Sequence, residues 1–146
     1  MSSVYRNSRL SFAYPENWAV DESQTDDGLT VSLQSPDLMF VIVTVYEHSR
    51  TPVEIADEAL DAMRDEYPDL ESSPVREVIA KRTAVGHDVN FFSLDLTNTC
   101  WIRSLSAGDQ SVLIFAQTND SYLETGEQVF RAICASLEIL DRAKSK

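Results

Sequence analysis

Glycine is scarce in this sequence of 146 residues, which contains only Gly28, Gly86, Gly108 and Gly126. A nucleotide-binding loop needs several glycines close together, because its backbone amides must approach the phosphates closely. Four isolated glycines argue against such a loop, and five prolines leave no room for a low-complexity tail. The G-x-S-x-G and H-E-x-x-H motifs are also missing, so the sequence carries no hydrolase signature of these kinds.

Basic residues are few as well. Lysine and arginine total 12, against 24 aspartates and glutamates, which gives a net charge of −12. This charge repels nucleic-acid phosphates and anionic lipids, so we expect neither nucleic-acid binding nor membrane insertion. The longest apolar run, residues 38–46, is too short to span a bilayer. Residues 1–11 lack the apolar core of a signal peptide, so with Met1 as the native start a cytoplasmic protein is expected.

Cysteine and histidine, the commonest metal ligands and nucleophile partners, occur twice each. Cys100 and Cys134 have no CxxC or histidine partner at metal-site spacing, so we expect two buried, unreactive thiols. His48 and His87 each have an acidic neighbour in the sequence. Because neighbouring side chains along a strand point to opposite faces of the sheet, this acidic residue is poorly placed to orient the histidine. The sequence therefore predicts no catalytic residue, no cofactor and no metal site, and we do not expect an enzyme.

The apolar pattern predicts strands first and a helix after them. Residues 29–37 alternate apolar and polar side chains, as in a strand with one solvent-exposed face. Residues 39–47 are apolar on both faces and predict a central strand. Residues 50–70 change to helical spacing. Thr51 as the cap and Pro52 in the first turn mark the start of this helix.

The second half predicts hairpins and a closing helix. Strands are expected within residues 73–80, 87–96, 99–106 and 111–118, with Gly86 and the AGDQ segment at 107–110 as turns. A helix follows within residues 120–140, with Ser121 and Glu124 as its capping box. Four phenylalanines are expected in the core: Phe91, Phe92, Phe115 and Phe130.

The element order predicts an α+β fold with an antiparallel sheet of about six to seven strands, flanked by two main helices. One domain over residues 1–146 is the simplest organisation, with its core at about residues 8–139. Two helices cannot cover so broad a sheet evenly, so part of one face is expected to stay open. The segment LSFAYPENWAV, residues 10–20, is interpreted as an architectural corner in which Trp18 packs back onto the domain.

Several segments together resemble the PsbP-like superfamily: LSFAYPENWAV, the pair LTVSLQSPD and FVIVTVYE, the helix opened by TPVEIADEAL, the segment VGHDVNFFSLDL and the closing VFRAICASLEI. That group includes the photosystem subunit PsbP, the Ran-binding import factor Mog, bacterial DcrB-type proteins and Eag-type chaperones. The resemblance covers residues 8–139 and implies an α/β/α sandwich that binds or chaperones other proteins. It supplies no catalytic residues.

Two sets of residues are candidates for contact with a partner. Asp57, Glu58 and Asp61 belong to an acidic stripe on the first helix, which is interpreted as a docking strip for a basic partner or as a solvated helix face. Trp101 and Arg103 share a strand face, and they are interpreted as interface anchors or as a Trp packed under a helix with an Arg at the sheet margin.

The favoured function is a non-enzymatic protein-binding domain of adaptor or chaperone-like kind. Its partner is expected to be another protein, and a homodimer remains open. The competing class is a small ligand-binding or catalytic domain with a pocket between sheet and helix, in which His87, Cys100 or Asp95 would converge.

Overall fold

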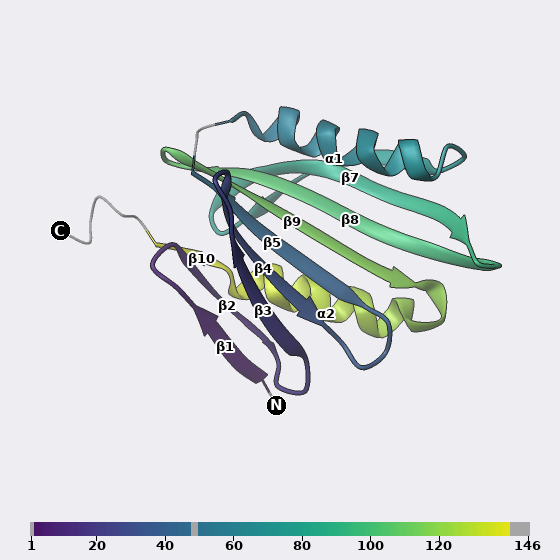
Figure 1. Cartoon of the computed structure of the whole chain (residues 1–146), viewed down its shortest axis with the longest axis horizontal. Coiled ribbons are helices and arrows are strands. Elements are labelled where there is room, and N and C mark those ends of the chain that lie inside the picture. The colour runs from purple at the N-terminus through teal and green to yellow at the C-terminus, as the bar shows by residue number, and fades with distance from the viewer. Residues whose placement is uncertain (1, 48–49, 141–146) are drawn as a thin grey trace.

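The structure is a computed structural model that describes residues 2–47 and 50–140. These residues form ten strands, two α-helices and one 3-10 turn (Figure 1). In chain order they are β1 (Ser2–Arg6), β2 (Leu10–Pro15), β3 (Ala19–Gln24), β4 (Gly28–Gln34), β5 (Phe40–Tyr46), α1 (Pro52–Glu66), β6 (Glu71–Ile79), β7 (Arg82–Ser93), β8 (Leu96–Ala107), β9 (Gln110–Asn119), the 3-10 turn Asp120–Tyr122, α2 (Leu123–Ser136) and β10 (Glu138–Ile139).

The strands form two antiparallel sheets. The large sheet has seven strands in the order β3-β4-β5-β9-β8-β7-β6, and the small one has the order β1-β2-β10. The predicted α+β class, the antiparallel pairing and the two main helices are confirmed. The small sheet was not predicted, because β1 and β10 are short and neither shows a marked apolar alternation.

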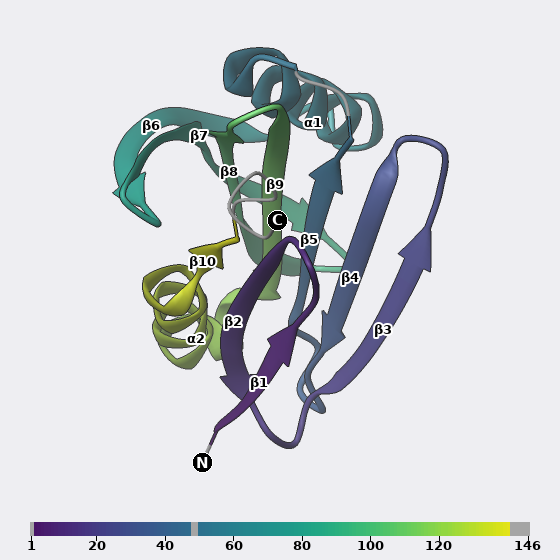
Figure 2. The ribbon, with the colours of Figure 1, turned by 90° about the vertical axis from the view of Figure 1, so that its left-hand side faces the viewer.

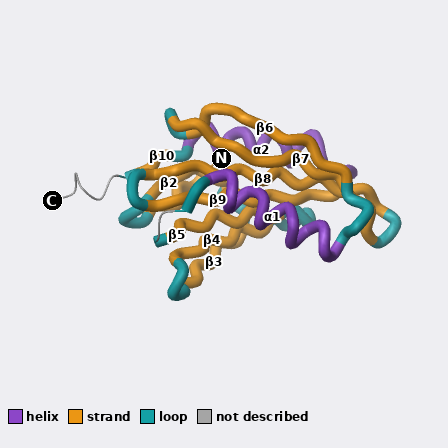
Figure 3. The backbone as a smooth tube through the Cα atoms, turned by 90° about the horizontal axis from the view of Figure 1, so that it is seen from above, coloured by secondary structure: helices purple, strands orange, loops and turns teal. Residues whose placement is uncertain are grey.

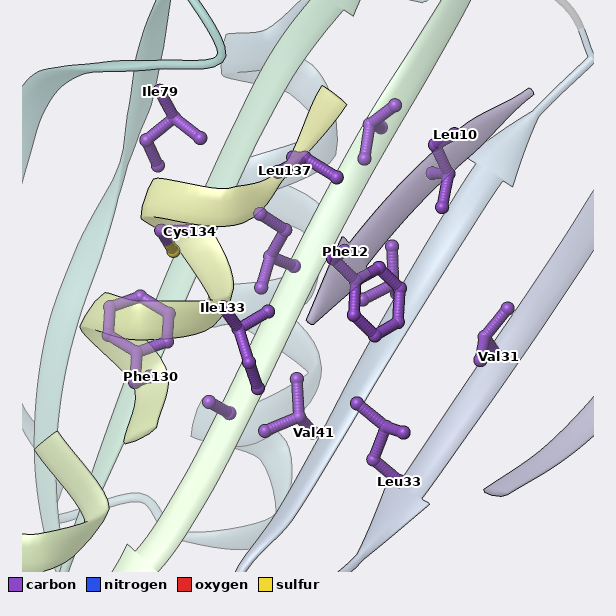
Figure 4. Close-up of a cluster of buried hydrophobic side chains, with 14 of the residues drawn as sticks. Leu10, Phe12, Val31, Leu33, Val41, Ile79, Phe130, Ile133, Cys134 and Leu137 are labelled. Carbon is purple, nitrogen blue, oxygen red and sulfur yellow. The ribbon is translucent and has the colours of Figure 1, made fainter. Parts of the chain in front are cut away.

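The large sheet is covered differently on its two faces. On one face α1 packs Ala56, Leu60 and Met63 against β7 and β8, where Val89 and Ile102 are fully buried. On the other face α2 and the small sheet together cover the larger core. Figure 4 shows part of this core, with side chains from β2 and α2 directed toward β4 and β5. Its labelled members are Leu10, Phe12, Val31, Leu33, Val41, Ile79, Phe130, Ile133, Cys134 and Leu137.

The start of α1 is as the sequence predicts, and the start of α2 is not. The Thr51 side chain accepts a hydrogen bond from the Glu54 backbone amide at 3.2 Å. The predicted capping box of Ser121 and Glu124 is wrong, because Asn119 instead caps the 3-10 turn that precedes α2 and accepts from the Ser121 amide at 3.0 Å. The α2 helix itself begins without a side-chain cap.

The predicted turn in the AGDQ segment is confirmed, since β8 ends at Ala107 and β9 begins at Gln110, but the predicted turn at Gly86 is wrong. Gly86 lies in the middle of β7, where a Cβ atom would stand 1.7 Å from the Ile102 carbonyl oxygen, so the glycine permits close strand approach and makes no turn. The β6–β7 turn is Ala80–Lys81, and the β7–β8 turn is Leu94–Asp95. All four turn residues have positive φ angles, between 53° and 65°. Such turns usually carry Asn or Gly, and because these two turns contain neither residue, they could not be predicted from the sequence.

The corner at residues 10–20 connects the two sheets. The Trp18 amide donates to the Pro15 carbonyl at 3.1 Å and turns the chain from β2 toward β3. The Trp18 side chain is 6% exposed and belongs to the larger core. The corner is therefore architectural, as the sequence predicts.

Candidate binding surface

Part of the large sheet is left uncovered beside α1. In Figure 2 α1 lies over β7, β8 and β9, while β5, β4 and β3 extend beyond it, and the view from above in Figure 3 shows the same arrangement. An open region of this kind was expected, because one helix covers about 10–12 Å of sheet and strands repeat every ~4.8 Å. We call this region the open face.

The open face consists of half-buried side chains from β4, β5 and the adjoining strand β9: Ser32, Phe40, Ile42, Thr44, Leu113 and Phe115. Of these, Leu113 and Phe115 also pack against the cluster beneath α1. The strand register places Ser32 beside Ile42 and Ile42 beside Phe115. Alternate residues of β5, such as Val41 and Val43, point to the opposite face and are buried in the larger core. The strand that the sequence predicts to be apolar on both faces therefore has one face in the core and one at the surface.

The centre of the open face is aromatic and its margin carries hydroxyl groups. The rings of Phe40 and Phe115 stack with their centroids 6.1 Å apart and their planes 17° from parallel. Thr30 and Thr44 share a hydrogen bond at 3.2 Å between β4 and β5. An apolar centre with a polar margin is the composition of a protein contact surface.

The surroundings of the open face are acidic. No lysine or arginine occurs between residues 10 and 49 or between 104 and 130, and these two segments contain β3, β4, β5 and β9 entire. The guanidinium of Arg50 stands at one end of the face, 5.5 Å from the ring centroid of Tyr46, and it pairs with Glu58 on α1. Burial raises the pKa of the Tyr46 hydroxyl, which stays neutral at physiological pH. The open face thus lies in a negative field.

The three acidic residues that the sequence singles out on α1 are exposed, and each contacts a nitrogen-bearing side chain: two of them contact arginines and Asp57 contacts a histidine. A carboxylate oxygen of Asp57 lies 2.9 Å from the His87 Nε2, and a carboxylate oxygen of Asp61 lies 3.7 Å from a guanidinium nitrogen of Arg64. Glu58 pairs with Arg50, whose backbone is fixed by the Ser111 hydroxyl on β9. The strip therefore carries less free charge than its sequence indicates. A docking role for it stays a prediction.

The other two candidates, Trp101 and Arg103, are buried at 2% and 0% exposure. The Trp101 ring stacks on Phe130 of α2, with centroids 5.0 Å apart. This placement matches the packing interpretation of the pair, with Arg103 in the interior and not at the sheet margin. Neither side chain can reach a partner without rearrangement of α2, so partner binding through them stays a prediction that the geometry does not support.

Arg103 is the centre of a buried ion network that the sequence did not reveal. Its Nε donates to Glu77, its second guanidinium nitrogen donates to Asp88 at 2.8 Å, and its guanidinium lies 5.6 Å from the Phe130 ring centroid. Arg131 of α2 pairs with the same Glu77 at 2.9 Å. The partners come from β6, β7 and α2, so only the fold brings them together.

The residues proposed for a catalytic pocket do not converge. His87 lies with Asp57 in an open groove of about 450 Å³ between α1 and β6–β7, whereas Cys100 is buried beneath α1 and Asp95 is in the β7–β8 turn. His48 lies outside the described residues. Burial raises the pKa of both thiols, that of Cys134 to about 12, so they stay protonated and are poor nucleophiles.

Two further observations limit the chemistry of the described residues. No group of three or more histidine, cysteine, aspartate or glutamate side chains in this part of the chain is arranged to hold a metal ion. Neither of its α-helices is long and apolar enough to cross a membrane. The core prediction also needs correction at two of its four positions, because Phe92 is 64% exposed and Phe115 is half-buried, while Phe91 and Phe130 are buried.

No family model and no curated protein matches the sequence, but solved structures share the fold. The chain superimposes on cyanobacterial PsbP (CyanoP) from Synechocystis with a TM-score of 0.70, 11% identity and coverage of 94% of this chain and 92% of that one. LpqN, which is involved in cell envelope biogenesis of Mycobacterium tuberculosis, matches with a TM-score of 0.61, 11% identity and coverage of 94% and 84%.

A protein from Bacteroides thetaiotaomicron matches with a TM-score of 0.61 and 13% identity, over 92% of this chain but 46% of that one. At these identities the likeness concerns the fold alone. The chain therefore has the PsbP-like fold that its sequence resembles.

Proposed function

We propose that this protein is a non-enzymatic binding domain that holds another protein against the open face. The observation that carries the proposal is the half-buried, stacked pair Phe40 and Phe115, in which Phe115 also packs against the cluster beneath α1 while Phe40 lies on β5, beyond the strands that α1 covers. Apolar surface of this kind is favourable to cover, at roughly 25 cal/mol per Å² removed from water. A partner supplies that cover.

The charge around the open face indicates the kind of partner. The strands of the face contain no lysine or arginine, and the whole chain has a net charge of −12. A partner with an apolar centre and basic residues at its rim is attracted to this surface and oriented by it. A second copy of the chain would bring carboxylates against carboxylates, so a homodimer through this face is the weaker candidate.

The proposal is tested by capture from native cells with three baits: the wild type, Ile42→Lys on the open face and Val78→Lys on β6. Val78 is 72% exposed on β6, at the opposite edge of the large sheet from β3, which makes it a matched control for the added charge. We expect one protein that is retained by the wild type and Val78→Lys and lost with Ile42→Lys. Identical captures with all three baits would contradict the proposal.

We place this interaction in the cytoplasm. The support is that Cys100 and Cys134 are both free and buried, on different faces of the large sheet, as is common where thiols are kept reduced. Cell fractionation followed by detection of the untagged protein tests this proposal, and recovery in an envelope or periplasmic fraction would overturn it.

A further inference from the structure

A second surface feature lies at the end of the molecule where β7 turns into β8. It is a groove of about 290 Å³ between the β4–β5 loop, the end of α1 and the β7–β8 turn. Leu38, Leu94 and Leu96 stand around it, and Tyr67 and Phe91 close its inner wall with ring centroids 4.2 Å apart. We call it the leucine-rimmed groove.

Two of the rim leucines contribute little to the packing of the domain. Leu94 is 92% exposed and Leu38 is 70% exposed, so neither contributes much buried apolar area. Both also have left-handed backbone, with φ angles of 53° and 72°, which is unfavourable for a leucine and easier for Asn or Gly. An exposed apolar side chain and a left-handed backbone each cost free energy. Their combination at the same residues indicates contact with a binding partner.

The floor of the groove is made of amide side chains: Asn98, Gln117 and Asn119. The Asn98 amide donates to the Leu96 carbonyl at 3.1 Å, and its own side-chain oxygen receives no hydrogen bond within the described residues. Gln117 is half-buried in the groove lining. An amide that both donates and accepts pairs with the backbone of an extended peptide.

The charge around the groove selects the side chains of that peptide. Asp37 precedes Leu38 in the β4–β5 loop, and Asp95 separates the other two rim leucines. The segments that line the groove, residues 35–47, 67–71, 88–102 and 110–122, contain no lysine or arginine. Successive side chains of an extended chain point in opposite directions, so apolar residues that face the leucines alternate with residues that face outward, toward the carboxylates.

We propose that the leucine-rimmed groove binds an extended peptide segment in which leucine-like side chains alternate with lysine or arginine. The groove adjoins the open face, since Gln117 pairs with Phe40 in the sheet, but Leu94 and Leu96 lie outside that face, so different variants test the two proposals and the proposals fail independently. The acidic neighbours also favour a peptide over an anionic membrane surface, which would repel Asp37 and Asp95.

The test uses short fluorescent peptides that alternate leucine with lysine, leucine with glutamate, or serine with lysine. Their binding to the full chain is measured by fluorescence anisotropy for the wild type, for the double variant Leu38→Asn and Leu94→Asn, and for Val78→Asn as the exposed control. Asn is chosen because it tolerates left-handed backbone, so the double variant is expected to fold. Circular dichroism and the thermal midpoint check that it does.

We expect the leucine–lysine peptide to bind the wild type and Val78→Asn equally and to bind the double variant at least about tenfold more weakly, as for the loss of one buried leucine contact. The other two peptides should bind the wild type at least about tenfold more weakly. Equal binding to the double variant, or equal binding of the serine–lysine peptide, would overturn the proposal. Neutral phosphatidylcholine vesicles are the last arm, and binding to them that depends on Leu94 would indicate a membrane contact instead.

Discussion

The rings of Phe40 and Phe115 stack across neighbouring strands, with centroids 6.1 Å apart, on the side of the sheet that carries α1, and Phe115 also packs against the cluster beneath that helix. The opposite side of the same strands packs against Phe12 and Ile133 in the larger core. The same strand segments therefore have one face buried in the larger core and the open face on their other side. Its open face is apolar and only partly covered by α1, and that makes it the surface to test first.

Replacing Asp57, Glu58 and Asp61 by their amides is expected to slow association with a basic partner. Glu58 and Asp61 already have arginine neighbours, so the loss is modest, about two- to tenfold in the association rate at low salt and less at high salt. Stopped-flow kinetics at two salt concentrations measure this effect. An association rate that is unchanged at low salt would leave the strip as a solvated helix face.

The Arg103 network should make a large contribution to stability. Arg103→Met leaves Asp88 and part of the charge of Glu77 without a partner, and breaking a buried pair costs roughly 3–5 kcal/mol, with the low end expected because both acids are partly exposed. Arg131→Met is the control, since Arg131 is about half exposed and its pair with Glu77 should contribute about 1 kcal/mol or less. Urea unfolding distinguishes the two, and equal losses would contradict the assignment.

Trp18→Ala is expected to lower the free energy of unfolding by about 3–5 kcal/mol, because it leaves a cavity in the larger core beneath the corner. Val78→Ala, at an exposed position, should change it by about 0.5 kcal/mol or less. The measurement is thermal or urea unfolding of both variants. If Trp18→Ala left the thermal midpoint unmoved, the corner would have no architectural role.

Stability should fall at alkaline pH because of the two thiols. Burial raises the pKa of Cys100 and of Cys134 above the ordinary value of 9.0, so the folded thiols stay protonated while the unfolded ones ionise. Their contribution is fully present below about pH 9 and is lost as the pH rises toward the folded pKa values, by about 1.4 kcal/mol per pH unit for each thiol. Urea unfolding in reductant between about pH 8 and pH 10 measures the slope.

Cys100→Ala isolates one of these thiols. The variant is expected to be less stable at all pH values. Its free energy of unfolding should also fall less steeply with rising pH, because one ionising thiol no longer contributes to the slope. A slope equal to that of the wild type would show that other groups cause the alkaline loss.

The helix α1 and the strand β5 could be predicted from the sequence because their signals are local. Thr51 and Pro52 mark the start of the helix, and the apolar run at 39–47 requires a strand inside the sheet. The edge strand β3 could not be predicted in this way, since its side chains are all exposed and mostly polar. Such a strand is fixed by its pairing with β4.

The turns and the buried ion network were beyond sequence reasoning for physical reasons. Leu94 has none of the local chemistry of a turn residue, and its left-handed backbone is imposed by the pairing of Ser93 with Leu96. Arg103 is buried because Glu77 and Asp88, at 26 and 15 residues' separation, meet it in space. The open face was foreseen only as a shortage of helix cover, and its residues became known from the position of α1.

The most direct measurement is the dissociation constant of the captured partner for purified wild type, Ile42→Lys and Val78→Lys, with folding of each variant verified by circular dichroism. We expect Ile42→Lys to weaken binding by at least about tenfold, because it removes an apolar contact and places a cation against a basic rim. Val78→Lys should bind as the wild type does. Equal dissociation constants for all three proteins would show that the open face is not the contact surface.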